Sequence, residues 1–385
     1  MTEEKTEKKS YVAYVGTYTN GSSRGIHIYD VDVEEGLLFL RKVVPVKNSS
    51  YMTVSRNEKY LYSIADEGVE VFKILPDGDL EPINKIEMDG MRGHQMTHDH
   101  SSHYLFVSGY HDGKITMIRT NEDGSLGRQL DGVFHKGEGG IGDLSWQPHC
   151  CCVRMTRDNK FLCGVDNALN YIAIYRINKD YERLEQIDVL RMGRNVGPRC
   201  IHFSMDGRFA YVLCEITCSV RLYEYSVDEN GYPVFDYIEE YGTLCDDHDV
   251  YDAAASMNIS EDGQHLIVSN AGDNSMAIFK INKEDGKLTR VLALPIAGLY
   301  PKDTCLFPDN KHVAVVNNGS NTITTFAVNY EKGTIVMKGR PQNLDKPNCM
   351  RFKEIEKAPE KFRNISEAEA EAEAEAEIKK SLTQL

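Results

Sequence analysis

Arg199 and Glu215 stand near the two ends of one short segment that the sequence predicts to be a β-hairpin. Residues 201–203 and 209–213 are largely apolar runs, and Asp206-Gly207 between them favours a tight turn. A hairpin brings the start of its first strand beside the end of its second, so we expect Arg199 and Glu215 to lie together. A guanidinium beside a carboxylate forms either a structural ion pair or part of a site that holds an anion and activates water.

The same hairpin pattern occurs six times along the chain. The copies are each about 16 residues long and run from Ser50 to Asp66, His94 to Tyr110, His149 to Asp166, Arg199 to Glu215, Ala254 to Asn270 and Lys302 to Asn317. Each copy is followed by a third extended run, a second turn such as Asp77-Gly78, and a weaker fourth run. Four antiparallel strands repeated every roughly 40–60 residues have the period of a propeller blade.

The two ends of the chain complete a seventh unit. Residues 11–45 supply three strands and lack the inner one, which the run Pro347–Phe352 supplies near the C-terminus. We therefore predict an all-β fold, a seven-bladed β-propeller of four-stranded antiparallel blades whose first blade is closed by strands from both termini. The expected organisation is a charged N-terminal extension at 1–10, the propeller at 11–352 and an acidic Glu/Ala-rich tail at 353–385 that we interpret as solvated.

In such a ring the inner strands line a central channel, and inner-strand starts meet second-strand ends at one mouth of that channel. The side chains predicted there are strongly polar. They are Ser50, His94, His149, Arg199, Ala254, Lys302 and Asn348 from the inner-strand starts, and Tyr18, Asp66, Tyr110, Asp166, Glu215, Asn270 and Asn317 from the second-strand ends. Polar groups that converge in a concavity suggest a small-molecule site, although propellers also use such residues to hold water and tie blades together.

Several short motifs, in order and in blade register, resemble a known family over about residues 11–352. The motifs are Gly16-Thr17-Tyr18-Thr19, Gln147-Pro148-His149, Gly197-Pro198-Arg199, Glu215, Ser260-Glu261-Asp262-Gly263 and Ser269-Asn270. They resemble the seven-bladed lactonase propellers of the 6-phosphogluconolactonase type, which are similar to carboxymuconate-lactonizing enzymes. The resemblance implies hydrolysis of a sugar-derived lactone, most simply 6-phosphogluconolactone to 6-phosphogluconate, at the channel mouth.

The resemblance also implies site residues. His149, Arg199 and Glu215 correspond to the family residues proposed to bind and turn over an acidic lactone, and we expect them to be catalytic. His149 or Glu215 could act as general base on water, and Arg199 suits a carboxylate or phosphate. We expect the substrate to be contacted by six further side chains, which are His94, Tyr110, Asp166, Asn270, Lys302 and Asn317.

The chain departs from the family pattern at three places. Ala271 stands where the family commonly has arginine, Cys200 where it has histidine, and Asn167-Ala168 where it has Leu-Gly. A lost arginine weakens an anion site. Two alternatives therefore stay open: a lactonizing cycloisomerase that acts on a carboxylated ligand, and a non-catalytic propeller that binds an anionic ligand or a protein.

The bulk composition indicates which partners to expect. The net charge of −15 argues against a nucleic-acid partner, and no apolar run of about 18 residues predicts a membrane span. The charged N-terminus lacks an apolar signal region, and ten cysteines without a disulfide pattern favour reduced thiols. We expect a cytoplasmic protein whose partner is a small anionic lactone or sugar acid, while the sequence leaves the oligomeric state unknown.

No metal or other cofactor is expected. His94, His98, His100 and His103 lie within ten residues, but the last two fall in a predicted turn, and a metal needs three or four converging ligands. Cys150–Cys152 lie on a predicted strand and must alternate between its faces, so we interpret them as small buried apolar residues. Trp146 is expected either to wall the pocket or simply to pack.

Overall fold

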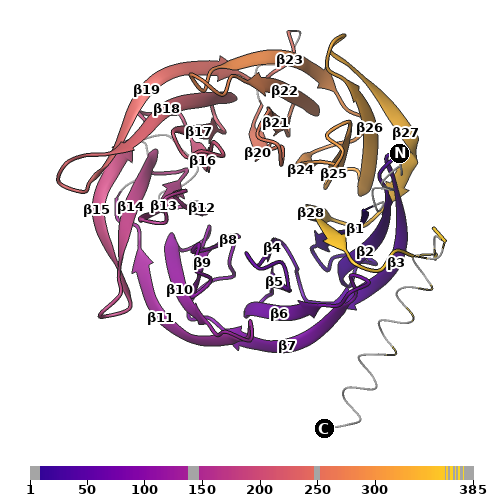
Figure 1. The fold of residues 1–385 in the computed structure, drawn as a ribbon, viewed down its shortest axis with the longest axis horizontal. Helices are drawn as coiled ribbons and strands as arrows, with labels where there is room; N and C mark the ends of the chain where they lie inside the picture. Colours follow the sequence, from indigo (N-terminus) through magenta and orange to yellow (C-terminus); the bar gives the residue numbers. More distant parts are fainter. Residues whose placement is uncertain are drawn as a thin grey trace, which may run out of the picture.

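The computed structural model describes residues 9–137, 147–246 and 252–359, with positions 361, 362, 365, 366, 369, 372 and 376 of the tail. These residues form seven four-stranded antiparallel sheets arranged in a ring around a central channel (Figure 1). The seven-bladed propeller predicted from the repeat is confirmed. We number the blades from 1, the sheet β28-β1-β2-β3, to 7, the sheet β24-β25-β26-β27.

The two inner strands of each blade supply the residues of the channel and of its two mouths. The innermost strands, in blade order, are β28 (Pro347–Ile355), β4 (Met52–Val54), β8 (Gln95–His98), β12 (Cys150–Met155), β16 (Pro198–Phe203), β20 (Ala254–Ile259) and β24 (Pro301–Leu306). The second strands are β1 (Ser10–Thr17), β5 (Tyr60–Ile64), β9 (Tyr104–Ser108), β13 (Phe161–Asp166), β17 (Phe209–Cys214), β21 (His265–Asn270) and β25 (His312–Asn317).

The two outer strands of each blade form the rim of the ring. The third strands are β2 (Gly25–Asp32), β6 (Gly68–Ile74), β10 (Lys114–Thr120), β14 (Tyr171–Asn178), β18 (Ser219–Val227), β22 (Ser275–Ile281) and β26 (Thr322–Asn329). The fourth strands are β3 (Leu37–Pro45), β7 (Leu80–Glu87), β11 (Leu126–Phe134), β15 (Arg183–Arg191), β19 (Pro233–Gly242), β23 (Leu288–Pro295) and β27 (Thr334–Asn343).

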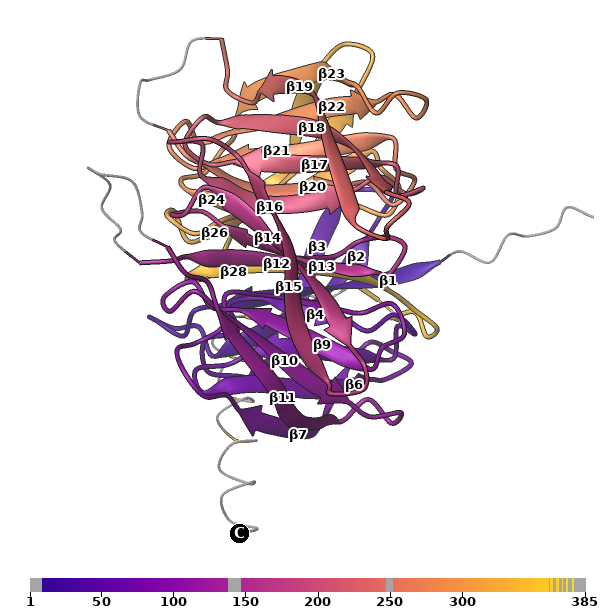
Figure 2. The ribbon, with the colours of Figure 1, turned by 90° about the vertical axis from the view of Figure 1, so that its left-hand side faces the viewer.

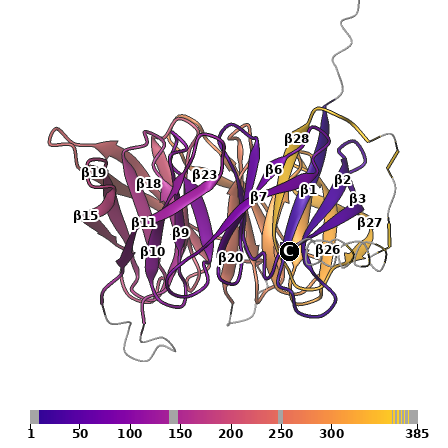
Figure 3. The same ribbon diagram turned by 90° about the horizontal axis from the view of Figure 1, so that it is seen from below.

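Burial follows this order of strands. Second strands such as β17 are buried at every residue because neighbouring blades pack on both of their faces. Fourth strands such as β7 are mostly exposed, because one of their edges faces solvent. Seen from the side, the strands cross the thickness of the disc, so each inner strand has one end at each mouth of the channel (Figures 2 and 3).

Blade 1 is closed by both ends of the chain, as the sequence predicts. β28 pairs with β1 in an antiparallel ladder from Ser10 opposite Ile355 to Thr17 opposite Pro347. The pairing gives β1 a hydrogen-bonded neighbour on each side, so β28 and not β1 forms the channel-side edge of blade 1. Beyond the ladder, the Phe362 ring stacks on the Phe39 ring, with their centroids 5.1 Å apart.

In each of three blades, a buried tyrosine forms a hydrogen bond to the next blade round the ring. Tyr14, Tyr62 and Tyr211, all on second strands, donate hydrogen bonds of 2.8, 2.6 and 2.8 Å to the carbonyls of Gly78, Gly124 and Gly286. Each glycine belongs to a predicted Asp-Gly turn and has a positive φ. A Cβ added to Gly286 would lie 2.5 Å from the Phe209 ring, so glycine is required there for space as well as for conformation.

The cysteines are packed as the sequence predicts. All ten lie within the described residues, and none forms a disulfide. Cys150, Cys151 and Cys152 are at most 2% exposed on β12, which confirms their interpretation as small buried residues. Within the described part of the chain, no helix is long and apolar enough to cross a membrane.

Candidate functional site

In five of the seven blades, a β-bulge aims one residue of the inner strand into the channel. The pairing of β16 with β17 passes from Pro198–Cys214 to Cys200–Leu213, which leaves Arg199 as the extra residue. The same slip leaves out Cys151, Ala255, Lys302 and Asn348 in blades 4, 6, 7 and 1. A bulge re-aims the side chain of its extra residue. These residues, with His94 and Ser50 from blades 3 and 2, line a channel cavity of about 90 Å³. We call this end of the channel the first mouth.

Arg199 is held by two contacts at the first mouth. Its Nη1 donates to Glu215 Oε2 at 2.6 Å, and its Nε donates to the Ala255 carbonyl at 2.6 Å. The two side chains are 11% and 26% exposed, so the pair is partly shielded from water. Asn167 Nδ2 also donates to Glu215 Oε2, at 2.8 Å. Among the described residues, no hydrogen bond is made to Glu215 Oε1, so this oxygen is available to a ligand or a water molecule.

A second cation lies beside this pair. Burial, together with the positive charge of Arg199, lowers the pKa of Lys302 to about 8, while Glu215 opposes the shift. The Lys302 ammonium lies over the Tyr300 ring, 5.5 Å from its centroid. Burial alone would lower the pKa of Arg199, but the Glu215 carboxylate more than offsets this and raises it. The site therefore places two basic side chains beside one acidic side chain.

Two histidines sandwich a tyrosine beside the cations. The Tyr110 ring stacks on His149 and on His94, with centroid distances of 4.2 and 5.3 Å. His94 Nδ1 lies 2.7 Å from the Cys151 carbonyl, so this nitrogen carries the proton and Nε2 carries the lone pair. Burial, Arg199 and Lys302 lower the pKa of His94 to about 3, which keeps the ring neutral.

His149 stands on the rim of the same mouth. Burial lowers its pKa, while the carboxylates of Asp166 and Glu215 oppose the shift. His149 lies two residues before Cys151, the bulge residue of blade 4. Cys151 therefore occupies the position in the channel that Arg199 occupies in blade 5. The structure therefore brings together His149, Arg199 and Glu215 with His94, Tyr110 and Lys302.

Three of the residues expected to contact substrate lie elsewhere. Asp166, Asn270 and Asn317 are fully buried. Asp166 Oδ2 is 2.8 Å from His135 Nδ1, and Asn270 and Asn317 donate to hydroxyls of Ser275 and Thr324. Each pairs as the last residue of its second strand, whereas Glu215 lies one residue beyond the end of β17. Because successive strand residues face opposite ways, that one-residue difference turns the first three side chains into the blade.

The same register shows a residue that sequence reasoning missed. Asn167, Glu215 and Ala271 each follow a second strand, and each donates its backbone N–H to the preceding inner-strand loop, at His149, Gly197 and Ala253. If the hairpin of blade 4 had been taken to end at Asn167 instead of Asp166, the sequence would have predicted Asn167 at the mouth. Ala271 is 6% exposed and brings no charge, and Cys200 lines the cavity wall. Trp146 lies outside the described residues.

A metal site would need three or four converging ligands. Within the described ranges, no three His, Cys, Asp or Glu side chains converge as metal ligands would. Of the histidine cluster, His94 lies at the first mouth, while His98 and His100 line a separate cavity at the other end of the channel.

The sequence also matches known proteins. The profile of the family described as "Lactonase, 7-bladed beta-propeller" matches residues 12–352. The chain belongs to this lactonase family. A protein of Staphylococcus epidermidis without an assigned function is 30% identical over 300 residues, which cover 76% of this chain and 85% of that protein.

Two further relatives of the lactonase carry functional names. A 6-phosphogluconolactonase of Bacillus subtilis is 27% identical over 304 residues, covering 77% of this chain and 85% of that protein. The solved structure of the Pseudomonas aeruginosa periplasmic gluconolactonase PpgL has a TM-score of 0.82 at 24% identity, covering 89% of this chain and 99% of that one. At that identity the similarity shows a shared fold. The family resemblance stated from the sequence motifs is thus confirmed.

Proposed function

We propose that this protein hydrolyses the cyclic ester of a sugar-derived lactone, with 6-phosphogluconolactone as the expected substrate. The observation that carries the proposal is the Glu215 carboxylate, fixed by Arg199 and Asn167 through one oxygen and open at the other, in a mouth that also holds Lys302. A fixed carboxylate beside cations suits water attack on an anionic ester. The Bacillus subtilis relative bears the name of this activity.

The residues of the first mouth suggest one assignment of roles. Glu215 Oε1 takes a proton from water, and the water oxygen forms a bond to the lactone carbonyl carbon. Arg199 and Lys302 stabilise the negative charge that develops on the carbonyl oxygen or hold the acidic group of the substrate. The bond between the carbonyl carbon and the ring oxygen then breaks, and the ring oxygen receives the proton. The open-chain sugar acid is the single product.

One observation favours a second candidate. Ala271 occupies the blade-6 position that corresponds to Glu215, where it is nearly buried and uncharged. A weaker anion site would suit a non-catalytic propeller that binds an anionic ligand. This candidate predicts that sugar acids bind at the first mouth while lactone hydrolysis stays at the spontaneous rate.

The test is hydrolysis of freshly prepared 6-phosphogluconolactone, measured above the spontaneous rate, in the wild type and in Arg199→Ala. We expect clear acceleration by the wild type and a loss of about 10²–10³-fold in kcat/KM for the variant. Arg221→Ala is the matched control, because Arg221 forms an ion pair with Glu240 in the same blade at 3.1 Å and does not line the cavity. Equal rates in wild type and Arg199→Ala would overturn the proposal.

We also propose that the protein works in the cytoplasm. Cys150, Cys151 and Cys163 are buried as thiols, and burial raises the pKa of each, so they behave as packing residues. A reducing compartment suits a chain with these thiols. Cell fractionation with an antibody against the protein tests this placement.

A further inference from the structure

A second cavity opens at the opposite end of the channel from Arg199. It has a volume of about 460 Å³ and is lined by the ends of the inner strands and the turns that follow them. We call this end the second mouth. Arg154, His202 and Asn258 line both this cavity and the cavity of the first mouth. These three side chains therefore form the waist between the two ends of the channel.

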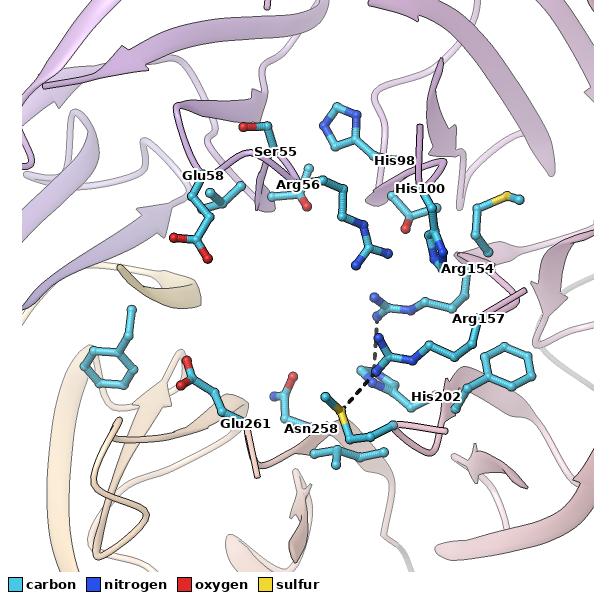
Figure 4. Close-up of a pocket in the computed structure, with 18 of the residues that line it drawn as sticks. Ser55, Arg56, Glu58, His98, His100, Arg154, Arg157, His202, Asn258 and Glu261 are labelled. Atoms are coloured by element: carbon cyan, nitrogen blue, oxygen red, sulfur yellow. Dashed lines mark hydrogen bonds between the residues drawn. The ribbon is translucent and has the colours of Figure 1, made fainter. Parts of the chain in front are cut away.

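Three arginines point into the second mouth from blades 2 and 4, the two blades on either side of blade 3. Arg56 and Arg157 occupy equivalent turn positions, directly after Ser55 and Thr156, whose hydroxyls bond to Asn57 and Asp158 two residues on. Arg154 comes from β12 itself. Figure 4 shows the three guanidinium groups directed toward the same side of the opening.

The positive charge of this cluster is not neutralised by the surrounding protein. No described carboxylate lies within ion-pair distance of Arg56, Arg154 or Arg157. The side-chain contacts found are Arg154 Nη2 to His202 Nε2 at 3.1 Å and Arg157 Nη2 to Met205 Sδ at 3.4 Å. Burial and the neighbouring arginines lower the pKa values of Arg56 and Arg157.

The nearby acids are committed elsewhere or stand apart. Asp99, which lies near Arg56, accepts hydrogen bonds from the backbone N–H groups of His103 and Tyr104, both at 2.8 Å. Glu58 forms an ion pair with Lys353 at 2.9 Å. Glu261 is exposed and lies across the opening from the arginines (Figure 4). The arginine side of the mouth thus keeps a net positive charge.

Buried polar atoms in the same wall also lack partners. His98 lines the cavity and is only 4% exposed, yet neither of its ring nitrogens makes a hydrogen bond of normal geometry. Arg154 Nε is buried without a partner as well. A buried polar group without a partner is costly, and nearly all such groups in folded proteins bind protein, water or a ligand. The His98 ring packs against Tyr62, 4.5 Å between centroids, and is turned away from the opening (Figure 4), so the three guanidinium groups alone carry the argument for a ligand.

We propose that the second mouth is a binding site for a small anion with at least two negative charges, such as a phosphorylated small molecule. Guanidinium groups donate paired hydrogen bonds to phosphate and carboxylate oxygens, and three together match more than one charge. The cavity has room for more than the bare phosphate group. This site does not depend on the lactonase activity proposed above.

The experiment measures binding of inorganic phosphate to the full-length protein by calorimetry, at constant ionic strength set with chloride. The variant Arg56→Ala/Arg157→Ala removes two of the three arginines, and Arg199→Ala serves as the matched change at the first mouth. We expect the double variant to lose at least tenfold in phosphate affinity, while Arg199→Ala keeps one phosphate site of wild-type affinity. No binding by the wild type, or equal affinity in the double variant, would overturn the proposal.

Thermal unfolding gives a second reading that does not require phosphate to bind tightly. Without phosphate, the double variant should unfold at a higher temperature than the wild type, because two mutually repelling charges are gone. With phosphate, the wild type should gain stability and the double variant should not. A double variant that unfolds below the wild type without phosphate and gains the same stabilisation with it would contradict the site.

Discussion

Arg199 and Glu215 meet at 2.6 Å across the hairpin of blade 5, and the same guanidinium is held on its other side by the Ala255 carbonyl of blade 6. The ion pair is therefore not a local feature of one hairpin. It fixes the carboxylate against two blades and leaves one carboxylate oxygen without a protein partner among the described residues. A rigid carboxylate of this kind needs little reorganisation when it accepts a proton.

Glu215→Gln tests the assignment of this carboxylate as general base. The variant keeps the shape and the hydrogen-bonding reach of the side chain but removes its basicity. We expect kcat for lactone hydrolysis to fall by about 10²–10⁴-fold with a small change in KM, measured by steady-state kinetics. If His149→Asn causes this fall and Glu215→Gln does not, the base is the histidine.

Asn167→Ala tests the positioning of Glu215. The variant removes one donor to Glu215 Oε2 and leaves the Arg199 contact in place. A single hydrogen bond contributes about 1 kcal/mol, so we expect kcat to fall about fivefold, with little change in KM. Asn167→Asp, which places a like charge beside Glu215, should shift the pH–rate profile toward higher pH. An unchanged profile would mean that Asn167 does not act through Glu215.

Lys302 should make anion binding depend on pH. Its pKa of about 8 means that the side chain loses its charge as pH rises through that value. We expect the Kd of 6-phosphogluconate, measured by calorimetry, to increase above about pH 8 in the wild type. Lys302→Arg should keep the low-pH affinity to higher pH, and Lys338→Met, on the outer rim, should behave as the wild type. A wild-type affinity that is flat up to pH 10 would contradict the role.

The same lysine should reduce stability at neutral pH. The pKa falls from 10.5 to about 8 on folding, so the unfolded chain binds the proton more tightly than the folded protein does between these values. Stability therefore rises with pH across this window. We expect Lys302→Met to raise the free energy of unfolding at pH 7 by about 1–3 kcal/mol and the difference from wild type to shrink by pH 10, measured by urea unfolding.

Tyr211→Phe should loosen the contact between blades 5 and 6. The change leaves the buried Gly286 carbonyl without the tyrosine hydroxyl that donates to it at 2.8 Å. We expect a loss of about 1–2 kcal/mol in the free energy of unfolding, measured with urea. Tyr237→Phe is a suitable control because Tyr237 is 57% exposed on the rim. Equal stability of both variants would mean that the tie contributes nothing.

The sequence was sufficient for the architecture because the signals repeat. Asp77-Gly78, Asp123-Gly124 and Asp285-Gly286 mark equivalent turns, and the missing inner strand of the first unit had a match at Pro347–Phe352. A periodic pattern fixes its own register several times over, so one ambiguous strand does not change the result. Arg199 and Glu215 followed from that register and meet in the structure.

The site could be predicted only in part, because β-bulges and the ends of strands decide where its side chains point. The bulge at Arg199 has no sequence signature, and the equivalent bulge of blade 4 puts Cys151, and not His149, at the matching position in the channel. Asp166 is the last residue of its second strand and points into the blade. Glu215 lies one residue beyond the end of its second strand and points into the first mouth. The second mouth was missed because two of its three arginines, Arg56 and Arg157, come from turns, where a charged residue is most simply interpreted as solvated.

The closure of blade 1 by β28 also sets an order in time. The partner of β1 begins at Pro347, so the ribosome must add more than 300 residues after β1 before that edge can be covered. At usual rates of synthesis this takes roughly 20 to 70 s. Until then, β1 presents an apolar strand with an unpaired backbone edge to the cell. The last strand to be made thus ends the period in which the nascent chain is most exposed to wrong pairing or chaperone capture.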